Sequence, residues 1–166
     1  MTSDRNKKIA ADCWRRGNEA LSKENWDYSI EMFSTAVKLD PEGLLYRQTK
    51  RGAERKKYGD NNAGSKMGML KIAGIKTKIK NSRRKKDWAS VDQYAEEGLT
   101  LNPWDPSLNA DMAEACQNLG YEDAAIFGYK MAIENDKAHK SYYTELAALL
   151  EEKQEFKSAR DCWEMA

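Results

Sequence analysis

The chain has 166 residues, of which 33% are charged and 40% belong to the hydrophobic set, so it can bury a core and is not disordered throughout. Its 28 Lys and Arg nearly balance its 27 Asp and Glu, and the net charge of +1 excludes a uniformly basic nucleic-acid-binding protein. The charges are nevertheless segregated, because residues 47–86 carry a net charge of +13 and the rest of the chain −12.

The sequence lacks the features of a secreted or membrane-spanning protein. Its start contains no apolar run of a secretory signal, and the longest aliphatic cluster, residues 146–150, is far shorter than the roughly 20 residues of a membrane span. The three cysteines are too few and too widely spaced for a disulfide framework or a zinc knuckle. We therefore expect a cytoplasmic protein with free thiols.

One spacing recurs along the chain: a small residue, an aromatic residue four positions later and a small residue three positions after that. A degenerate copy ends at Gly98, and the intervals from Gly98 to Ala132 and from Ala132 to Ala166 are both 34 residues. A fixed period of this length indicates a repeat architecture. The full copies are Ser29–Phe33–Ala36, Ala125–Tyr129–Ala132 and Ala159–Trp163–Ala166.

The first copy, residues 13–41, and the helix-ending sequences Leu39-Asp40-Pro41 and Leu101-Asn102-Pro103 resemble the tetratricopeptide repeat (TPR) family. The resemblance implies an all-α fold, a TPR-type α-solenoid of antiparallel helix pairs that forms a single domain over residues 1–166. The interval from Ala36 to Gly98 exceeds one period by 28 residues, so we expect an expanded second repeat. The expected repeats cover about 10–43, 44–103, 104–137 and 138–166, the last one incomplete.

Helix boundaries follow from periodicity, prolines and turn residues. Pro41 and Pro103 end helices because proline has no backbone donor, and Asp105-Pro106 begins one. The abrupt end at Ala166 suggests a fragment of a longer protein or an end that packs on a partner. The expected helices are 6–22, 26–39, 44–58, 66–86, 88–101, 106–118, 122–135, 140–152 and 156–166.

The second repeat has two candidates for its first helix, and the sequence leaves the choice open. Counting forward from Pro41 puts Arg51 at the position of the small residue, whereas counting back from Val91 puts Ile79 there. Ile79 shares a helix face with Ile72 and Ile75. We interpret 44–58 as an extra helix and 66–86 as a long basic helix.

The basic helix predicts an anionic partner or a solvated face. Its charge suits the phosphates of a nucleic acid, although no aromatic residue between Tyr58 and Trp88 is available for base stacking. An acidic protein segment would also suit this charge, as would a membrane surface, which basic amphipathic helices bind. The basic patch comprises Lys76, Lys80, Arg83, Arg84, Lys85 and Lys86.

No catalytic constellation is evident, so we expect no enzyme activity, no cofactor and no metal site. The only histidine, His139, lies in a predicted turn and cannot by itself form a triad or a multi-histidine metal site. Gly64, Gly68 and Gly74 do not have the spacing of a phosphate-binding loop.

The resemblance to the TPR family implies a non-catalytic scaffold for protein–protein interaction that binds a peptide or a helix of unknown identity in its concave groove. The alternative is nucleic-acid or anionic-surface binding through residues 66–86, and free solenoid ends are compatible with self-association. Trp14, Ala110 and Glu114 replace the basic residues with which chaperone adaptors of the family bind a carboxylate, so that mode is disfavoured. The expected groove residues are Trp14, Asn18, Ser22, Ala110, Glu114, Gln117, Asn118, Thr144, Glu151 and Glu152.

Overall fold

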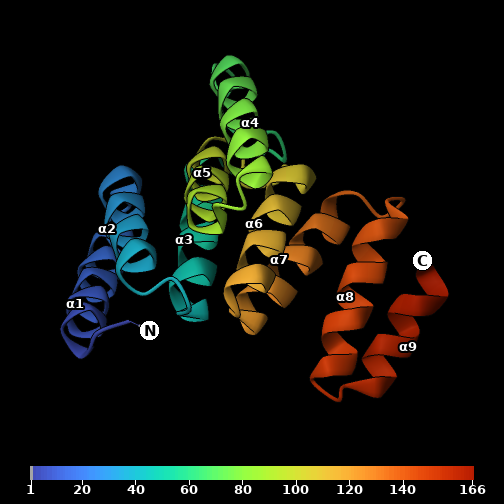
Figure 1. Ribbon diagram of the computed structural model, residues 1–166. Helices are drawn as coiled ribbons and strands as arrows, with labels where there is room; N and C mark the ends of the chain where they lie inside the picture. Colours follow the sequence, from blue (N-terminus) through green and yellow to red (C-terminus); the bar gives the residue numbers. More distant parts are fainter. Residues whose placement is uncertain (1) are drawn as a thin grey trace.

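The computed structural model describes residues 2–166, which form nine α-helices and no strand (Figure 1). Each helix lies within three residues of the expected bounds, so the all-α prediction is confirmed. The helices are α1 (Asp4–Leu21), α2 (Trp26–Leu39), α3 (Leu44–Lys57), α4 (Met69–Arg84), α5 (Trp88–Leu101), α6 (Pro106–Leu119), α7 (Glu122–Asn135), α8 (Lys140–Glu152) and α9 (Phe156–Met165).

Local sequence signals set the ends of these helices. Ser3, Asn25, Asp87 and Asp105 each accept a hydrogen bond from a backbone N–H of the first turn, which satisfies one of the donors that a helix start leaves free. Gly120 ends α6 with φ at 80°, a backbone conformation that favours glycine. Short turns of this kind place successive helices antiparallel to each other.

Small residues let the two helices of a pair approach closely. A Cβ atom added to Gly17 of α1 would collide with the ring of Phe33 of α2, and one added to Gly128 of α7 would lie 2.8 Å from Ala113 Cβ of α6. Phe33, Ala113 and Ala147 are fully buried. Close packing of small and aromatic residues therefore builds the regular pairs α1–α2, α6–α7 and α8–α9.

Of the two candidate helices, α4 packs far more extensively on α5 than α3 does. Ile75 and Ile79 are buried against α5 and α6, in the core that also contains Val91, Ala95 and Leu108. α3 is a single helix that packs on α2 from the first pair and on α5 and α7 from the pairs that follow.

Because α3 is a single helix, the pairs after it run in the opposite direction to the first pair. Arg47 Nη2 donates both to the backbone oxygen of Pro41, just after α2, and to Asp92 in the first half of α5. At the opposite end of both helices, Asp27 of α2 and Thr100 of α5 line the same surface hollow. α2 and α5, the second helices of their pairs, are thus antiparallel to each other.

Candidate functional site

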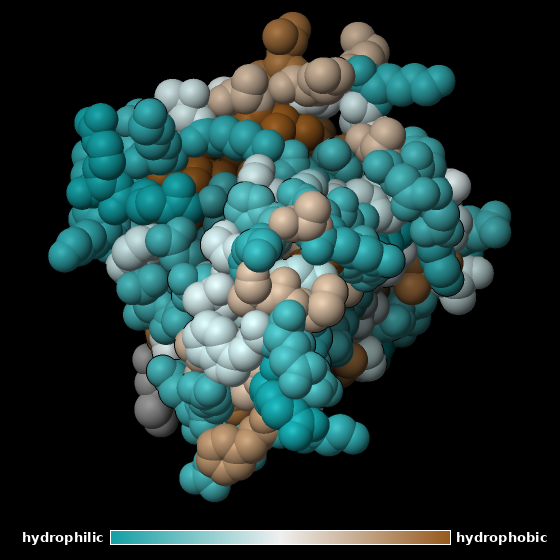
Figure 2. All heavy atoms as spheres, turned by 90° about the vertical axis from the view of Figure 1, so that its right-hand side faces the viewer, coloured by the Kyte–Doolittle hydropathy of each residue, from teal (hydrophilic) through white to brown (hydrophobic). Residues whose placement is uncertain are grey.

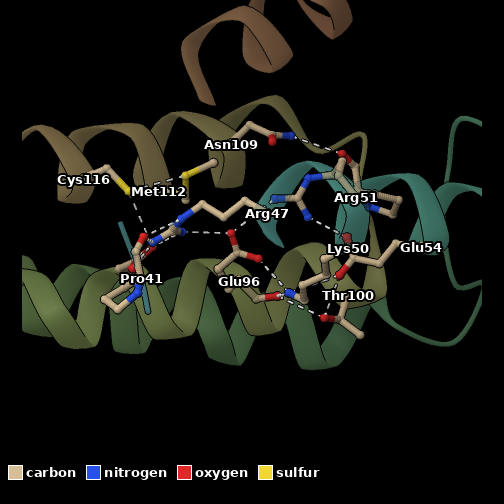
Figure 3. A network of polar contacts seen from close by, with 12 residues as sticks. Pro41, Arg47, Lys50, Arg51, Glu54, Glu96, Thr100, Asn109, Met112 and Cys116 are labelled. Atoms are coloured by element: carbon tan, nitrogen blue, oxygen red, sulfur yellow. Dashed lines mark hydrogen bonds and ion pairs between the residues drawn. The ribbon is translucent and has the colours of Figure 1, made fainter. Parts of the chain in front are cut away.

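The most deeply buried charged residues lie on one face of α3. Arg47, Lys50, Arg51 and Glu54 occupy positions i, i+3, i+4 and i+7 of this helix, and none is more than 2% exposed. Figure 3 shows their side chains lying between α5 on one side and α6 on the other. An apolar stripe normally has this spacing, so here charged side chains occupy the place of a hydrophobic core.

These charges are neutralised by two carboxylates of α5 and one of α3. Arg47 Nη2 lies 2.7 Å from Asp92 Oδ2, and its Nη1 lies 3.1 Å from Glu96 Oε1. Lys50 Nζ donates to Glu96 Oε2 at 2.6 Å and to the Glu96 backbone oxygen at 3.0 Å. Together with the Arg51–Glu54 pair at 2.6 Å, three cations meet three anions, and the cluster has no net charge (Figure 3). We call Arg47, Lys50, Arg51, Glu54, Asp92 and Glu96 the ionic layer.

The neighbouring opposite charges determine the direction in which the pKa values of Glu96 and Arg47 are shifted. Burial by itself would raise the pKa of Glu96, but the neighbouring Lys50, Arg51 and Arg47 hold it well below its ordinary value. Burial likewise opposes the charge on Arg47, and Asp92 overcomes that effect, so the pKa of Arg47 is raised. Glu96 and Arg47 are therefore both charged at neutral pH, and ion pairs join α3 to α5.

A cleft of about 500 Å³ opens between α2 and α5 above the ionic layer. Val37, Pro41 and Leu101 contribute apolar lining, whereas Lys50 and Glu96 reach its floor. Because the floor charges are already paired with each other, the cleft presents no free buried charge to a ligand.

Ion pairs also join α4 to α6 along the other face of the array. Lys76 Nζ lies 2.8 Å from Asp105 Oδ2, and Arg83 Nη2 lies 2.5 Å from Asp111 Oδ1 and 2.7 Å from Glu114 Oε2. The basic helix is thus partly neutralised by the acidic repeats that follow it. These contacts place a basic wall on α4 next to an acidic wall on α6.

Beyond this acidic wall lies a hollow of about 430 Å³ between α6 and α8. The α6 wall carries acid and amide side chains, and the α8 wall carries hydroxyl and acid side chains. The hydroxyl of Tyr129, from α7, lies 3.5 Å from Gln117 Oε1. The lining residues are Ala110, Asp111, Glu114, Gln117, Asn118, Tyr129, Ser141, Tyr142 and Glu145. We call this hollow, with the adjoining basic wall of Lys76, Lys80, Arg83 and Arg84, the groove.

Partial burial perturbs titratable groups in the groove, among them Asp111 and Tyr129. Burial raises the pKa of Asp111, and its hydrogen bond to Arg83 only partly offsets the rise. The pKa of Tyr129 is raised by burial and then by Glu145 and Glu114, so its phenol stays protonated and can donate a hydrogen bond. The groove therefore offers hydrogen-bond donors and acceptors together with negative charge.

The structure brings together one part of the predicted groove residues. Ala110, Glu114, Gln117 and Asn118 all line the hollow. The predicted α8 residues lie around its edge or away from it: Thr144 donates to Lys140 O at 3.3 Å, Glu151 accepts from Trp163 Nε1 at 2.6 Å, and Glu152 is exposed.

The predicted residues of α1 lie apart from the hollow. Trp14 Nε1 donates to Thr49 Oγ1 of α3 at 3.1 Å, and Asn18 donates to the Trp14 backbone oxygen at 2.8 Å. Ser22 donates to the backbone oxygen of Glu19 at 2.7 Å. Because α3 separates α1 from α4, these side chains do not continue the surface formed by α6 and α8.

The predicted basic patch is divided by the fold. Lys76 and Arg83 face α6 in the ion pairs described above, whereas the four remaining cations are exposed and form no ion pair within residues 2–166. These free cations are Lys80, Arg84, Lys85 and Lys86.

Some residues of the hollow and of the ionic layer were not predicted from the sequence. Asp111 and Glu145 lie one position along from predicted groove residues, and Tyr129 is the aromatic residue of the recurring spacing. Their signal was the helical register, since Asp111 shares its face of α6 with Glu114. The ionic layer was missed because its partner carboxylates lie about 45 residues away in the chain.

Other kinds of site find no support in the part of the chain that the structure describes. Residues 2–166 contain no group of three His, Cys, Asp or Glu side chains placed to hold a metal ion. Nor does any helix in this range combine the length and apolarity needed to cross a bilayer.

Comparison with known proteins identifies the fold. No protein-family model matches the sequence, and no curated protein sequence does. The TPR2AB domain of yeast Sti1, solved in complex with pHSP90, has a TM-score of 0.58 at 21% identity, covering 96% of this chain and 61% of that one. MamA matches at 0.55 and 12% identity over 90% and 91% of the two chains, and PilF of Pseudomonas aeruginosa at 0.53 and 13% over 98% and 77%. The chain thus has the fold of TPR proteins.

Proposed function

We propose that this TPR-type solenoid is a non-catalytic interaction scaffold that binds a peptide segment of a partner protein in the groove. The observation that supports this most directly is the hollow between α6 and α8, whose wall combines Glu114, Gln117 and Asn118 with Ser141 and Glu145. Such side chains can hydrogen-bond the backbone of an extended segment. The complex of the yeast Sti1 domain with pHSP90 is a precedent for partner binding by this fold.

The charges of the groove favour a partner segment of mixed charge. Exposed Lys80 and Arg84 on the α4 wall would attract an acidic side chain, and Glu114 and Glu145 at the hollow would attract a basic one. Arg83, which is shared between Asp111 and Glu114, lies at the boundary of these two halves. A bound peptide would therefore have its acidic part on α4 and its basic part near α8.

Peptide-array binding followed by affinity measurement tests the proposal. We expect Glu114→Ala, Gln117→Ala and Glu145→Ala, combined in one variant, to weaken the best peptide at least about tenfold, since each removes a polar contact worth roughly 0.5–1.5 kcal/mol. Lys157→Ala combined with Glu164→Ala, at exposed positions of α9, is the control and should bind normally. Equal affinity of both variants would refute the groove as the binding site.

A second candidate function is nucleic-acid binding by the free end of the basic helix. Lys80, Arg84, Lys85 and Lys86 favour it, because they are exposed and form no ion pair within residues 2–166. Filter binding across a salt series would then show affinity falling steeply with salt, and changing the four residues to Gln would abolish the binding. Absence of binding at low salt would exclude this function.

A further inference from the structure

The most exposed apolar side chains of the described chain gather at the start of α4. Met67 and Leu70 are each 89% exposed and Met69 is 78% exposed, although the hydrophobic effect favours burying side chains of this kind. Farther along the same helix, Ile75 and Ile79 are buried in the core. The fold therefore uses the apolar face of α4 for packing but leaves its first turn uncovered. We call Met67, Met69 and Leu70 the apolar tip.

The tip protrudes from the molecule. α4 stands out above the other helices in Figure 1, and Figure 2 shows brown and tan side chains capping the same edge of the molecule. A protruding apolar group fits a deformable surface, whereas it would need a matching pocket on a folded partner. Isolated exposed apolar residues are ordinary, but a contiguous and projecting group marks an interaction surface.

The charged residues next to the tip in the sequence are all basic. Lys66 and Lys71 flank it, both are exposed, and neither forms an ion pair within residues 2–166. The nearest acidic residue along the chain on the N-terminal side is Asp60, and residues 61–86 contain none. Lysines beside inserted apolar residues can keep their ammonium groups at the level of lipid headgroups, where anionic lipids attract them.

We propose that the apolar tip docks on an anionic lipid surface, with Met67, Met69 and Leu70 entering the headgroup–acyl boundary and Lys66 and Lys71 contacting the anionic headgroups. The tip is distinct from the groove, so a peptide and a membrane can be bound at the same time. Three apolar side chains and two lysines give reversible attachment rather than permanent insertion.

Vesicle flotation of the purified full chain tests the proposal. We expect the protein to float with vesicles of phosphatidylcholine and phosphatidylserine and to stay behind with phosphatidylcholine alone. Met67→Ser, Met69→Ser and Leu70→Ser in one variant should weaken partitioning at least about tenfold, because the buried apolar area is lost. Lys66→Gln and Lys71→Gln should weaken it about fivefold each.

Two control variants test whether the tip itself carries the binding. Phe156→Ser combined with Met165→Ser removes exposed apolar side chains from α9 and should leave flotation unchanged. Changing Lys80, Arg84, Lys85 and Lys86 to Gln should weaken flotation less than the tip variant does. The proposal is overturned if no flotation occurs with the anionic vesicles, if the tip variant still floats, or if binding follows the four distal cations instead. Circular dichroism of the tip variant should match the parent, because the changed side chains are exposed.

Discussion

Helices α6 and α7 pack on each other mainly through apolar side chains, whereas α3 and α5 contact each other through charged ones. Between α6 and α7, Ala113 and Gly128 allow backbone contact, and most of the buried side chains are apolar. Between α3 and α5, six charged side chains fill the interface. The first interface requires small side chains at the contact, whereas the second requires an anion for every cation.

The charged interface differs from the apolar one more in how precisely it positions the helices than in how much it stabilises the fold. Burying charges costs desolvation energy that their attraction scarcely repays, so an apolar α3–α5 interface of the same shape would be at least as stable. The hydrogen-bonded fork of Arg47 on Asp92 nevertheless fixes the position of α3 along α5. We infer that the ionic layer sets the register of the one helix that has no pair.

The largest expected effect comes from breaking the ionic layer. Arg47→Met leaves Asp92 and Glu96 buried with less compensation, and the free energy of unfolding should fall by about 3–5 kcal/mol. Urea denaturation followed by circular dichroism measures it. A loss below about 1 kcal/mol would mean that the layer admits water or rearranges, and the contrast with the apolar pairs would disappear.

Overfilling an apolar pair should cost less. Ala113→Leu forces a larger side chain into the contact with Gly128, and we expect a loss of about 1–3 kcal/mol by the same measurement. Ala73→Leu, at an exposed position of α4, is the matched control and should change stability little. If both variants were equally stable, close approach would not be what holds the regular pairs together.

Acid should destabilise the ionic layer selectively. The folded-state pKa of Glu96 lies below its ordinary value of 4.5, so its contribution to stability is complete above that pH and is lost as the pH falls further. We expect this carboxylate to lower the free energy of unfolding by up to about 1.4 kcal/mol per pH unit below that point. Glu96→Gln, although less stable at neutral pH, should show a shallower dependence on pH between 4.5 and 2.5 or so. An unchanged slope would assign acid sensitivity to other groups.

The smallest effect is expected for an ion pair of the same type at the surface. Arg15 bridges Asp12 and Glu19 on α1, but its side chain is 60% exposed. Arg15→Ala should therefore leave the unfolding midpoint unchanged within error, because exposed ion pairs are screened by water and salt. A loss similar to that of Arg47→Met would show that burial is not what distinguishes the two pairs.

The sequence was most informative where local signals decide the structure. Helix bounds followed from Pro41, Asp105-Pro106 and the small–aromatic–small spacing, all of which act within a few residues or repeat with a fixed period. The position of α3 could not be predicted this way, because Arg47, Lys50 and Arg51 resemble a solvated face until Asp92 and Glu96 are brought next to them. Their i, i+3, i+4 spacing on one face was the available signal.

The groove was predictable only in part for the same reason. Glu114, Gln117 and Asn118 occupy groove positions of a regular TPR register, and they line the hollow. Trp14 and Asn18 satisfy that register equally well, yet they lie on the far side of α3. Register within a repeat is a local property, whereas continuity between repeats depends on what lies between them.

Because α3 is a single helix, the direction of each helix pair depends on whether the number of helices before it is odd or even. Each helix reverses the course of the chain, so an odd number between two pairs turns one pair end over end relative to the other. The turn that joins α1 to α2 therefore lies on the same edge of the solenoid as the α5–α6 connection, and the turns within later pairs lie on the opposite edge. Helices can be grafted into or deleted from this array in twos without changing that arrangement, but removing α3 alone would invert the first pair.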